Sequence, residues 1–584
     1  MNSKVKHQTI ALRNLKFVSF KLKSPWFFAY LCLTILSLLF RNYIPADAGS
    51  DSPNDDWLGI RLAHNLLTGN WLGNWNNLTL AKPPGSPIYL AFIHFIPLQF
   101  IVVDQLIFCI FALYFVNNLG KIIPVSSKYL SILKFVSYFF LIFAPYLYQT
   151  SMSRVYRQTF DTIFIFAFFS LCIPVLSFLS SWQYIKSKNY AKGVRKFYIS
   201  IFFLGSLYAL LFLFEADSYW IFVAIAVAIS ALGVFKILEF RKRSRGTALI
   251  FTKLIAFGLV IGFIGFIVPV SLVGQINKSV YGSSLVEDFY SGNFADALEK
   301  WEAVKNGIDQ RPYVPVSSGQ RQALYEISPT GQLMKPYLEL PPGIGWRQQS
   351  CGSPVKICDN STSWFGWDMR DAAESASRAQ NELQFQTYLG QVARDLSSAC
   401  ESKRLDCEHK GSGPGTKWLL YLPRAELLRD FLSNLQAPLQ LSGMADGAVK
   451  TPDHYPGTNA QIVSEFHQVA NYRALPLNSV VQPKTFSRPL YNLGLFYFPF
   501  YIVFLTIAGL GYLIAWRKNI RLLIYSAFLL LTSGICIFSL GIAVFQTSLG
   551  WLQQGLYLLP SYALFQILAV IGLFAFFARK TNEA

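Results

Sequence analysis

Long apolar runs follow one another along this chain, and a single polar interval, 275–489, interrupts them. A run of roughly 18 or more apolar residues is long enough to cross a bilayer as a helix. The pattern therefore predicts an all-α polytopic membrane protein with about ten transmembrane helices. We expect these at 25–44, 96–118, 129–148, 159–181, 197–214, 219–240, 249–272, 491–516, 522–545 and 555–577.

The runs divide the chain into four parts. These are a basic N-terminus (1–24), a seven-span membrane module (25–272) whose first outer loop covers 45–87, a soluble domain (275–489) and a three-span C-terminal module (490–584).

The soluble domain is predicted to be mainly helical. Apolar residues recur at helical spacing over 385–396 and again over 427–435. Ser317 followed by Gln320 matches a capping box, which marks the start of a helix.

The distribution of charge predicts the side of the membrane on which each loop lies. The chain has 51 Lys and Arg against 32 Asp and Glu, a net charge of +19, and 275–489 holds 21 of the basic and 22 of the acidic residues. The membrane part therefore carries the whole excess of positive charge. Its basic groups fall at both termini and in alternate loops, as the positive-inside rule requires. We expect both termini in the cytoplasm, the soluble domain outside it, and no nucleic acid as a partner.

Half of the eight cysteines lie in the soluble domain, in a compartment that permits disulfides. They allow three connectivities, of which the two local pairs, Cys351–Cys358 and Cys400–Cys407, are favoured. A zinc site is the alternative, although neither pair has the short CxxC spacing that is usual for zinc.

The first outer loop contains the strongest candidates for chemistry. It is longer than ordinary loops, which suggests a function, and it begins with acidic residues and ends in AKPPGSP. Asp55 or Asp56 could take a proton from an acceptor as a general base. Lys82 is a point charge suited to phosphate. The tryptophans between them either stack on sugars or form part of the interfacial aromatic belt.

Two other outer turns carry charged pairs. Arg154 and Arg157 are three residues apart, so they share one face if the segment is helical. They could bind a phosphate, or they could reach toward lipid headgroups. Glu215 and Asp217 would face the same cavity, as a second carboxylate, as metal ligands or as a solvated turn.

This combination resembles the GT-C superfamily, membrane glycosyltransferases that use polyprenyl-phosphate-linked sugars, such as protein O-mannosyltransferases and lipid A aminoarabinose transferases. The resemblance rests on the seven-span module, on Asp55-Asp56 in the first outer loop and on the Lys82-Pro83-Pro84 turn back into the membrane. A group of poorly characterised bacterial GT-C-like proteins is closer still, although many of its members look to have KGPG where this chain has KPPG. The similar stretches are DDWLGIRLAHNLLTGNWLGNWNNLTLAKPPGSP, SRVYRQTFD, RPYVPVSSGQRQALYEISP, SWFGWDMRDAAESA and ACESKRLDC.

The resemblance implies a glycosyltransferase at the outer face of a bacterial inner membrane. It would move a hexose or pentose from polyprenyl phosphate to a glycan, lipid or protein acceptor. Asp55 or Asp56 would be the base, and the site for the donor and its phosphate would consist of Lys82, Arg154, Arg157, Glu215 and Asp217. A divalent ion such as Mg²⁺ or Mn²⁺ is compatible with the acidic residues, but no spacing demands one.

Other classes of function stay open. A non-catalytic assembly or receptor protein would bind a partner through its outer domain, and the acidic loop would then be incidental. A transporter of lipid-linked glycans needs charged or broken segments deep in the bundle, often in repeated halves, and the sequence shows no internal repeat. A polysaccharide polymerase would handle similar lipid-linked substrates.

Overall fold

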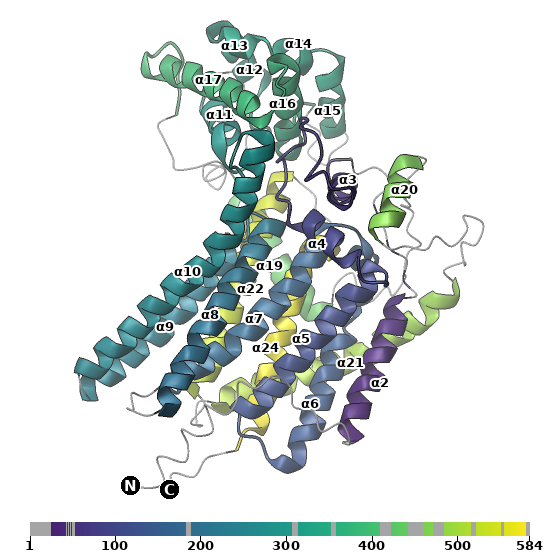
Figure 1. The fold of residues 1–584 in the computed structure, drawn as a ribbon, viewed down its shortest axis with the longest axis vertical. Coiled ribbons are helices and arrows are strands. Elements are labelled where there is room, and N and C mark those ends of the chain that lie inside the picture. Colours follow the sequence, from purple (N-terminus) through teal and green to yellow (C-terminus); the bar gives the residue numbers. More distant parts are fainter. Residues whose placement is uncertain are drawn as a thin grey trace.

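The computed structural model describes residues 25–579 except 43, 45, 47, 49–52, 183–187, 244, 307–312, 352–357, 409–421, 442–459, 471–483, 516–520 and 550–553. The predicted N-terminal segment 1–24 lies outside the described residues. Within the described part, the chain is all-α, with two isolated β-bridges and no strand. A bundle of long helices carries a smaller helical domain at one end (Figure 1).

Nine helices of the described chain are long and apolar enough to cross a membrane, and they coincide with nine of the ten predicted runs. α7 and α24 lie at the centre of the bundle, where their side chains are mostly buried. The nine are α2 (Pro25–Asn42), α5 (Phe100–Ile122), α7 (Arg157–Ser180), α8 (Lys188–Phe214), α9 (Tyr219–Arg243), α10 (Arg245–Tyr281), α21 (Lys484–Ala515), α22 (Arg521–Leu549) and α24 (Leu559–Phe577).

The one remaining predicted run, 129–148, forms a shorter helix than predicted. α6 (Ser127–Ile142) has 16 residues, fewer than the roughly 20 that a straight span requires. Two 3₁₀ helices follow it, η1 (Pro145–Tyr148) and η2 (Thr150–Ser153). The helix ends because Pro145 disfavours helical backbone at the preceding residue, which is extended. The prediction of one continuous span here is wrong.

One end of the bundle carries the basic turn between α5 and α6. Val125, in the turn between α5 and α6, pairs with Ala578 just after α24. Lys121 and Lys128 flank this turn, and the helical domain lies at the opposite end of the bundle (Figure 1). This arrangement is the one that a cytoplasmic basic turn and an outer domain would need, and the orientation itself stays a prediction.

α10 connects the bundle to the helical domain. Its 37 residues extend about 55 Å at 1.5 Å per residue, whereas the hydrocarbon core of a bilayer is about 30 Å thick. Its last turns therefore project beyond the other spans and present Asn277 and Tyr281 to the first outer loop. Asn277 Oδ1 accepts a hydrogen bond from Trp71 Nε1 (2.8 Å), and the Tyr281 hydroxyl donates to the carbonyl of Gly73 (2.8 Å).

The helical domain has a hydrophobic core of its own, built around the fully buried Trp301. The apolar face predicted over 385–396 is confirmed, because the residues that form it on α17 are all buried: Phe385, Leu389, Val392 and Leu396. The capping box of Ser317 and Gln320 is confirmed as well. The domain contains α11 (Gly292–Glu302), α12 (Ser318–Ile327), α13 (Pro329–Gln332), α14 (Lys335–Leu338), α15 (Pro341–Cys351), α16 (Thr362–Ser377) and α17 (Glu382–Glu401).

Both predicted disulfides are present, Cys351–Cys358 and Cys400–Cys407. The second one closes the turn after α17. The backbone of Cys407 also forms an isolated antiparallel β-bridge with Val304, just after α11. The disulfide therefore ties the end of α17 to the segment that pairs with the residues following α11.

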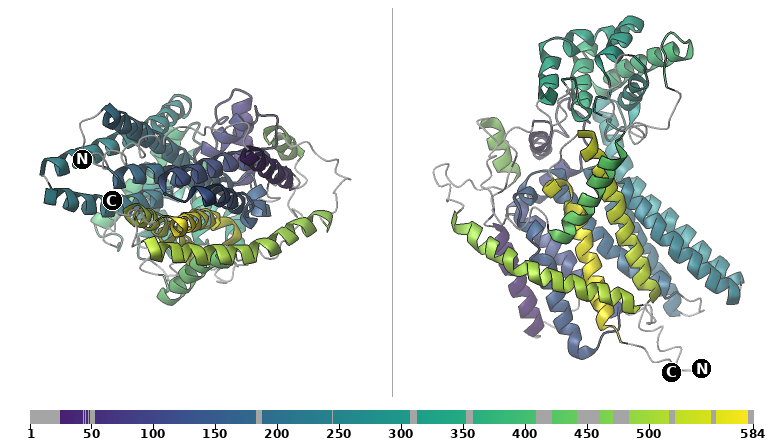
Figure 2. Two further views of the ribbon diagram at one scale, coloured as in Figure 1. Left: turned by 90° about the horizontal axis from the view of Figure 1, so that it is seen from below. Right: turned by 180° about the vertical axis from the view of Figure 1, so that it is seen from behind.

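Two helices from the predicted soluble interval lie against the membrane part instead (Figure 2). α19 (Arg424–Gln440) packs on α22, and its buried face is polar: Asp430 accepts from the Thr547 hydroxyl (2.9 Å), and Asn434 is fully buried. Its leucines Leu428 and Leu432 are more than half exposed. The helix predicted over 427–435 is confirmed, but its apolar face is only partly buried: Leu435 packs against the core of the bundle, whereas these two leucines are largely exposed. α20 (Ala460–Val469) packs on the first outer loop.

An impermeant thiol reagent applied to intact cells tests the predicted orientation. Thr387→Cys on α17 and Lys128→Cys in the basic turn both place a thiol at an exposed position. We expect labelling of Thr387→Cys only, with Lys128→Cys labelled after the cells are lysed. The unsubstituted chain, which has four free cysteines, is the control. Labelling of Lys128→Cys alone in intact cells would reverse the assignment.

Candidate functional site

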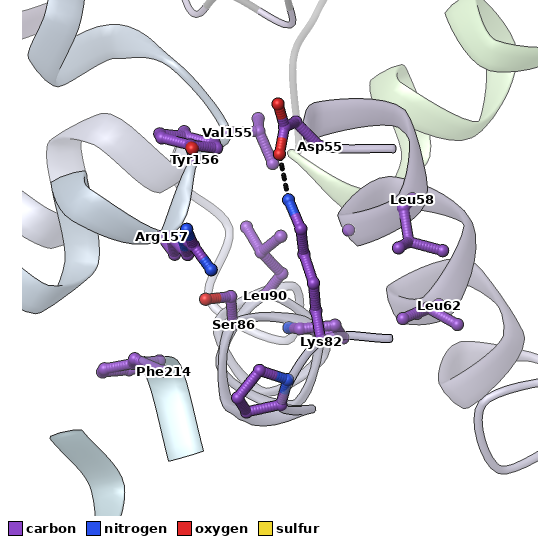
Figure 3. A pocket seen from close by; sticks show the side chains of 13 residues that line it. Asp55, Leu58, Leu62, Lys82, Ser86, Leu90, Val155, Tyr156, Arg157 and Phe214 are labelled. Carbon is purple, nitrogen blue, oxygen red and sulfur yellow. Dashed lines mark hydrogen bonds and ion pairs between the residues drawn. The ribbon is translucent and has the colours of Figure 1, made fainter. Parts of the chain in front are cut away.

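The first outer loop folds into two short helices that frame a pocket. α3 (Asp56–Leu67) begins directly after Asp55, and α4 (Gly85–Ile93) begins directly after the two prolines. Asp55 makes no hydrogen bond as the N-cap of α3, and its carboxylate instead forms an ion pair with Lys82 Nζ (Figure 3). Residues 27 positions apart in the sequence therefore meet at the pocket.

Gly85 allows α4 to approach the membrane bundle closely. A Cβ atom at this position would lie 2.4 Å from the carbonyl oxygen of Leu213, near the end of α8. Any larger residue would push α4 away from α8, and the turn that holds Lys82 would move with it. This contact explains a glycine directly after Pro83 and Pro84 in the predicted turn.

The pocket has one polar and one apolar side. Its empty volume is about 420 Å³, measured out to its open mouth. Figure 3 shows Lys82 and Arg157 converging on it from opposite sides, with Asp55 at its rim. The apolar wall comes from α3, α4 and the end of α8. The lining residues are Asp55, Leu58, Gly59, Leu62, Lys82, Pro83, Ser86, Pro87, Leu90, Val155, Tyr156, Arg157 and Phe214.

The two adjacent aspartates have different surroundings. Asp56 is fully buried, and both of its carboxylate oxygens accept hydrogen bonds from Arg154, from Nε at 3.1 Å and from Nη2 at 2.9 Å. Arg154 lies in extended backbone before α7, so it does not share a helical face with Arg157, which begins that helix. The pair Asp56–Arg154 thus fastens α3 to the segment before α7, and Asp55 remains at the pocket.

Asp55 is held in its ionised form by the cations around it. Burial alone would raise the pKa of this carboxyl, but Lys82, Arg157 and Arg154 together lower the pKa below its ordinary value. Burial lowers the pKa of Lys82, although Asp55 acts in the other direction. The Asp55 side chain keeps 42% of its surface exposed, so a reactant can reach it.

A second ion pair lies on the far side of the pocket. Arg157 Nη2 is 2.9 Å from Glu215 Oε1, in the short turn between α8 and α9. Burial raises the pKa of Glu215 to about 8, although Arg157 and Lys82 oppose this shift. Asp217 is exposed two residues later. The structure thus brings Asp55, Lys82, Arg157 and Glu215 together, with Asp217 beside them.

Two polar atoms in the pocket wall are available to hydrogen-bond with a ligand. Ser86 Oγ and Arg157 Nε are buried and have no hydrogen-bond partner within the described part of the chain. A buried donor without a partner costs free energy, commonly about 1–3 kcal/mol. Ser86 is also the second residue of α4, so the positive end of that helix faces the same space. These features suit an anionic ligand.

The arrangement of possible metal ligands in the described part of the chain does not support metal binding at this site. Over the residues that the structure describes, no three His, Cys, Asp or Glu side chains come close enough together to hold a metal ion. The four cysteines of the helical domain are engaged in the two disulfides, which replaces the alternative of a zinc site there.

The helical domain holds the loop that carries Lys82. Arg370 on α16 is fully buried, forms an ion pair with Asp288, and donates to the carbonyl oxygens of Asn77 and Thr79. The amide of Asp288 donates to the carbonyl of Leu80 (3.0 Å). Leu80 has a φ of +58°, a left-handed conformation that is uncommon for a leucine. The clamp fixes the backbone two residues before Lys82.

Several residues at the site were not predicted from the sequence. Tyr156 lies between the two arginines, its ring centroid 4.9 Å from the guanidinium carbon of Arg154 and 5.7 Å from Lys82 Nζ. Trp367 reaches Lys82 from α16, and Tyr557 hydrogen-bonds with Tyr156 from a short helix of the C-terminal module. A tyrosine beside two arginines could have been noticed, whereas nothing local distinguishes the other two aromatic residues.

Comparisons with known proteins add no assignment. No protein-family model, curated protein or solved structure matches this chain.

The contrast between the two aspartates can be tested by thermal unfolding of the purified protein in detergent. Asp56→Ala removes the carboxylate opposite Arg154, and breaking a buried ion pair costs about 3–5 kcal/mol. We expect a clear fall in the unfolding midpoint. Asp55→Ala is the matched control and should shift the midpoint much less, because its side chain is partly exposed. Equal shifts would contradict the structural role of Asp56.

Proposed function

We propose that this chain is a membrane glycosyltransferase of the GT-C type, which transfers a sugar from a polyprenyl-phosphate donor to an acceptor at the outer face of a bacterial plasma membrane. The observation that carries the proposal is the pocket at Lys82 and Arg157. It combines two cations, unpaired buried donors at Ser86 and Arg157, and an apolar wall, with the carboxylate of Asp55 at its rim.

The donor phosphate would bind between Lys82 and Arg157. Both cations reach the same space, and the Arg157 guanidinium offers its unpaired Nε together with the donors that Glu215 leaves free. The Ser86 hydroxyl and the positive end of α4 add to this anion site. Leu58, Leu62 and Leu90 would contact the first isoprene units, since these side chains form the apolar wall beside the cations.

Asp55 would act as the base. It would take the proton of an acceptor hydroxyl or amine while the acceptor atom attacks the anomeric carbon. The bond from that carbon to the phosphate oxygen then breaks, and polyprenyl phosphate leaves with the electron pair. Lys82 and Arg157 stabilise the charge that develops on the leaving phosphate. A single carboxylate serving as a base predicts inversion at the anomeric carbon.

The ion pair between Lys82 and Asp55 gives this mechanism an order of events. A phosphate that binds to Lys82 competes with Asp55 for the same ammonium group. Once Lys82 turns to the phosphate, Asp55 loses part of the charge that lowers its pKa and becomes a stronger base. Donor binding would therefore activate the base only when the sugar is in place.

A radiolabelled transfer assay with purified protein tests the proposal. Asp55→Asn should lower turnover by about 10²–10⁴-fold, the usual contribution of a general base, while donor binding is kept. Asp56→Asn is the control: it should lower stability, but the folded fraction should keep its turnover. If Asp55→Asn and the double variant Asp55→Asn/Asp56→Asn both retain wild-type turnover, the assignment of the base is wrong.

Donor affinity should depend on pH through Glu215. Glu215 has a pKa of about 8. Below that pH its carboxyl is protonated and leaves Arg157 free to bind the phosphate, and above it the carboxylate competes for the guanidinium. Since the donor phosphodiester keeps one charge over this range, affinity should fall as the pH rises through 8. We expect Glu215→Gln to remove most of this fall, as measured by equilibrium binding. An unchanged profile in that variant would assign the fall to Lys82.

A further inference from the structure

Two aromatic side chains from the part of the chain after α10 lie near residues of the phosphate pocket, although neither lines the pocket itself. Trp367 lies on α16, with its ring centroid 5.7 Å from Lys82 Nζ. Tyr290 lies in the turn before α11, and its phenol interacts electrostatically with Asp217, Arg157 and Glu215. Trp367 therefore lies beside Lys82, and Tyr290 lies within electrostatic range of Arg157, the two cations that we assign to the donor phosphate.

Trp367 is fixed in this position by its neighbours. Its ring packs on Phe289, with ring centroids 4.7 Å apart and planes inclined by 59°. The preceding residue is Gly366, where a Cβ atom would lie 2.7 Å from the Phe289 ring. Because Gly366 has no side chain, Phe289 can approach α16 and pack against the Trp367 ring. Trp367 is itself only half buried, so part of its surface remains open to a ligand.

Tyr290 faces solvent although it is a large aromatic residue. It is 63% exposed, while its neighbour Phe289 packs against the core of the helical domain. Its turn is closed by Glu287, whose carboxylate accepts from the Tyr290 amide (3.2 Å). The turn thus holds a largely exposed phenol within electrostatic range of the carboxyl groups of Glu215 and Asp217. An aromatic ring beside hydrogen-bonding acceptors is the pattern of a site for a ligand with one apolar and one polar surface.

A pyranose ring has these two surfaces, because its C–H groups form apolar faces and its hydroxyls surround them. We propose that Trp367 and Tyr290 bind the sugar of the donor, and that the sugar is a neutral hexose. The inference rests on the proposed function and adds its sugar subsite. Glu215 and Asp217 can hydrogen-bond to sugar hydroxyls. Both cations of the pocket are already assigned to the phosphate, which leaves neither of them to pair with a sugar carboxylate.

Binding of two kinds of lipid to the full-length protein in nanodiscs tests this subsite. The probes are undecaprenyl phosphate and the same lipid linked to glucose, mannose or glucuronic acid. We expect the wild-type protein to bind at least one of the neutral-hexose lipids more tightly than the bare phosphate, and the glucuronic acid lipid no more tightly than the bare phosphate. Trp367→Ala should lose about 10-fold in affinity for the preferred hexose lipid and keep its affinity for undecaprenyl phosphate.

Three variants separate the subsite from effects on folding. Trp364→Ala changes the same residue type on the same helix, where the indole pairs with Trp346, and it should leave both affinities unchanged. Trp367→Phe should recover most of the affinity for the hexose lipid. Tyr290→Ala alters an exposed side chain, so it tests the subsite even if Trp367→Ala fails to fold.

The outcomes distinguish this inference from the proposed function. Failure of the wild-type protein to bind either lipid would overturn the donor site itself. Equal binding of undecaprenyl phosphate and all of its sugar-linked forms would overturn the sugar subsite and leave the phosphate site standing. An equal loss for both lipids in Trp367→Ala would show that Trp367 acts through Lys82 alone, and this result would also overturn the subsite.

Discussion

The buried guanidinium of Arg370 is the interaction on which the site depends. A charge removed from water is stable in a protein only when it is paired and its hydrogen bonds are satisfied. Asp288 supplies the opposite charge, and the remaining donors go to the backbone of Asn77 and Thr79. The helical domain therefore cannot bury this arginine without the first outer loop. The two parts fold against each other, and the position of Lys82 follows from the domain as much as from the membrane helices.

The pocket places two ion pairs side by side, Lys82 with Asp55 and Arg157 with Glu215. Each cation has a carboxyl partner when the pocket holds no ligand: the ionised Asp55 balances Lys82, and Glu215 balances Arg157 once it ionises. When an anion enters between the two cations, it replaces the carboxyl groups as their partner. Its charge is therefore paired as soon as it is buried. The apolar wall beside the cations favours an anion attached to a hydrocarbon chain over a free one. This exchange links the electrostatics of the pocket to the lipid-linked donor that we propose.

Periodicity and charge predicted most of the fold, and their failures have physical causes. Nine of the predicted spans are apolar helices, whereas the run that ends in α6 stops early because of Pro145. The leucine pattern of α19 predicted a helix but not its surroundings, since an apolar face can turn to a core or to lipid. Near the site, Asp55, Lys82 and Arg157 stand out because charged residues are rare in this part of the chain. Trp367 does not, since its role arises only from packing between residues far apart in sequence.

Tyr557 and Trp367 give the site a consequence for the synthesis of the protein. The first outer loop leaves the ribosome well before Trp367 and Arg370, and Tyr557 follows later still. At about 5–20 residues per second, on the order of tens of seconds pass between the loop and its clamp. During that time the loop has neither its clamp nor its aromatic neighbours. A nascent or truncated chain thus holds the charged residues without the geometry, and the complete site forms only after Tyr557 has been synthesised.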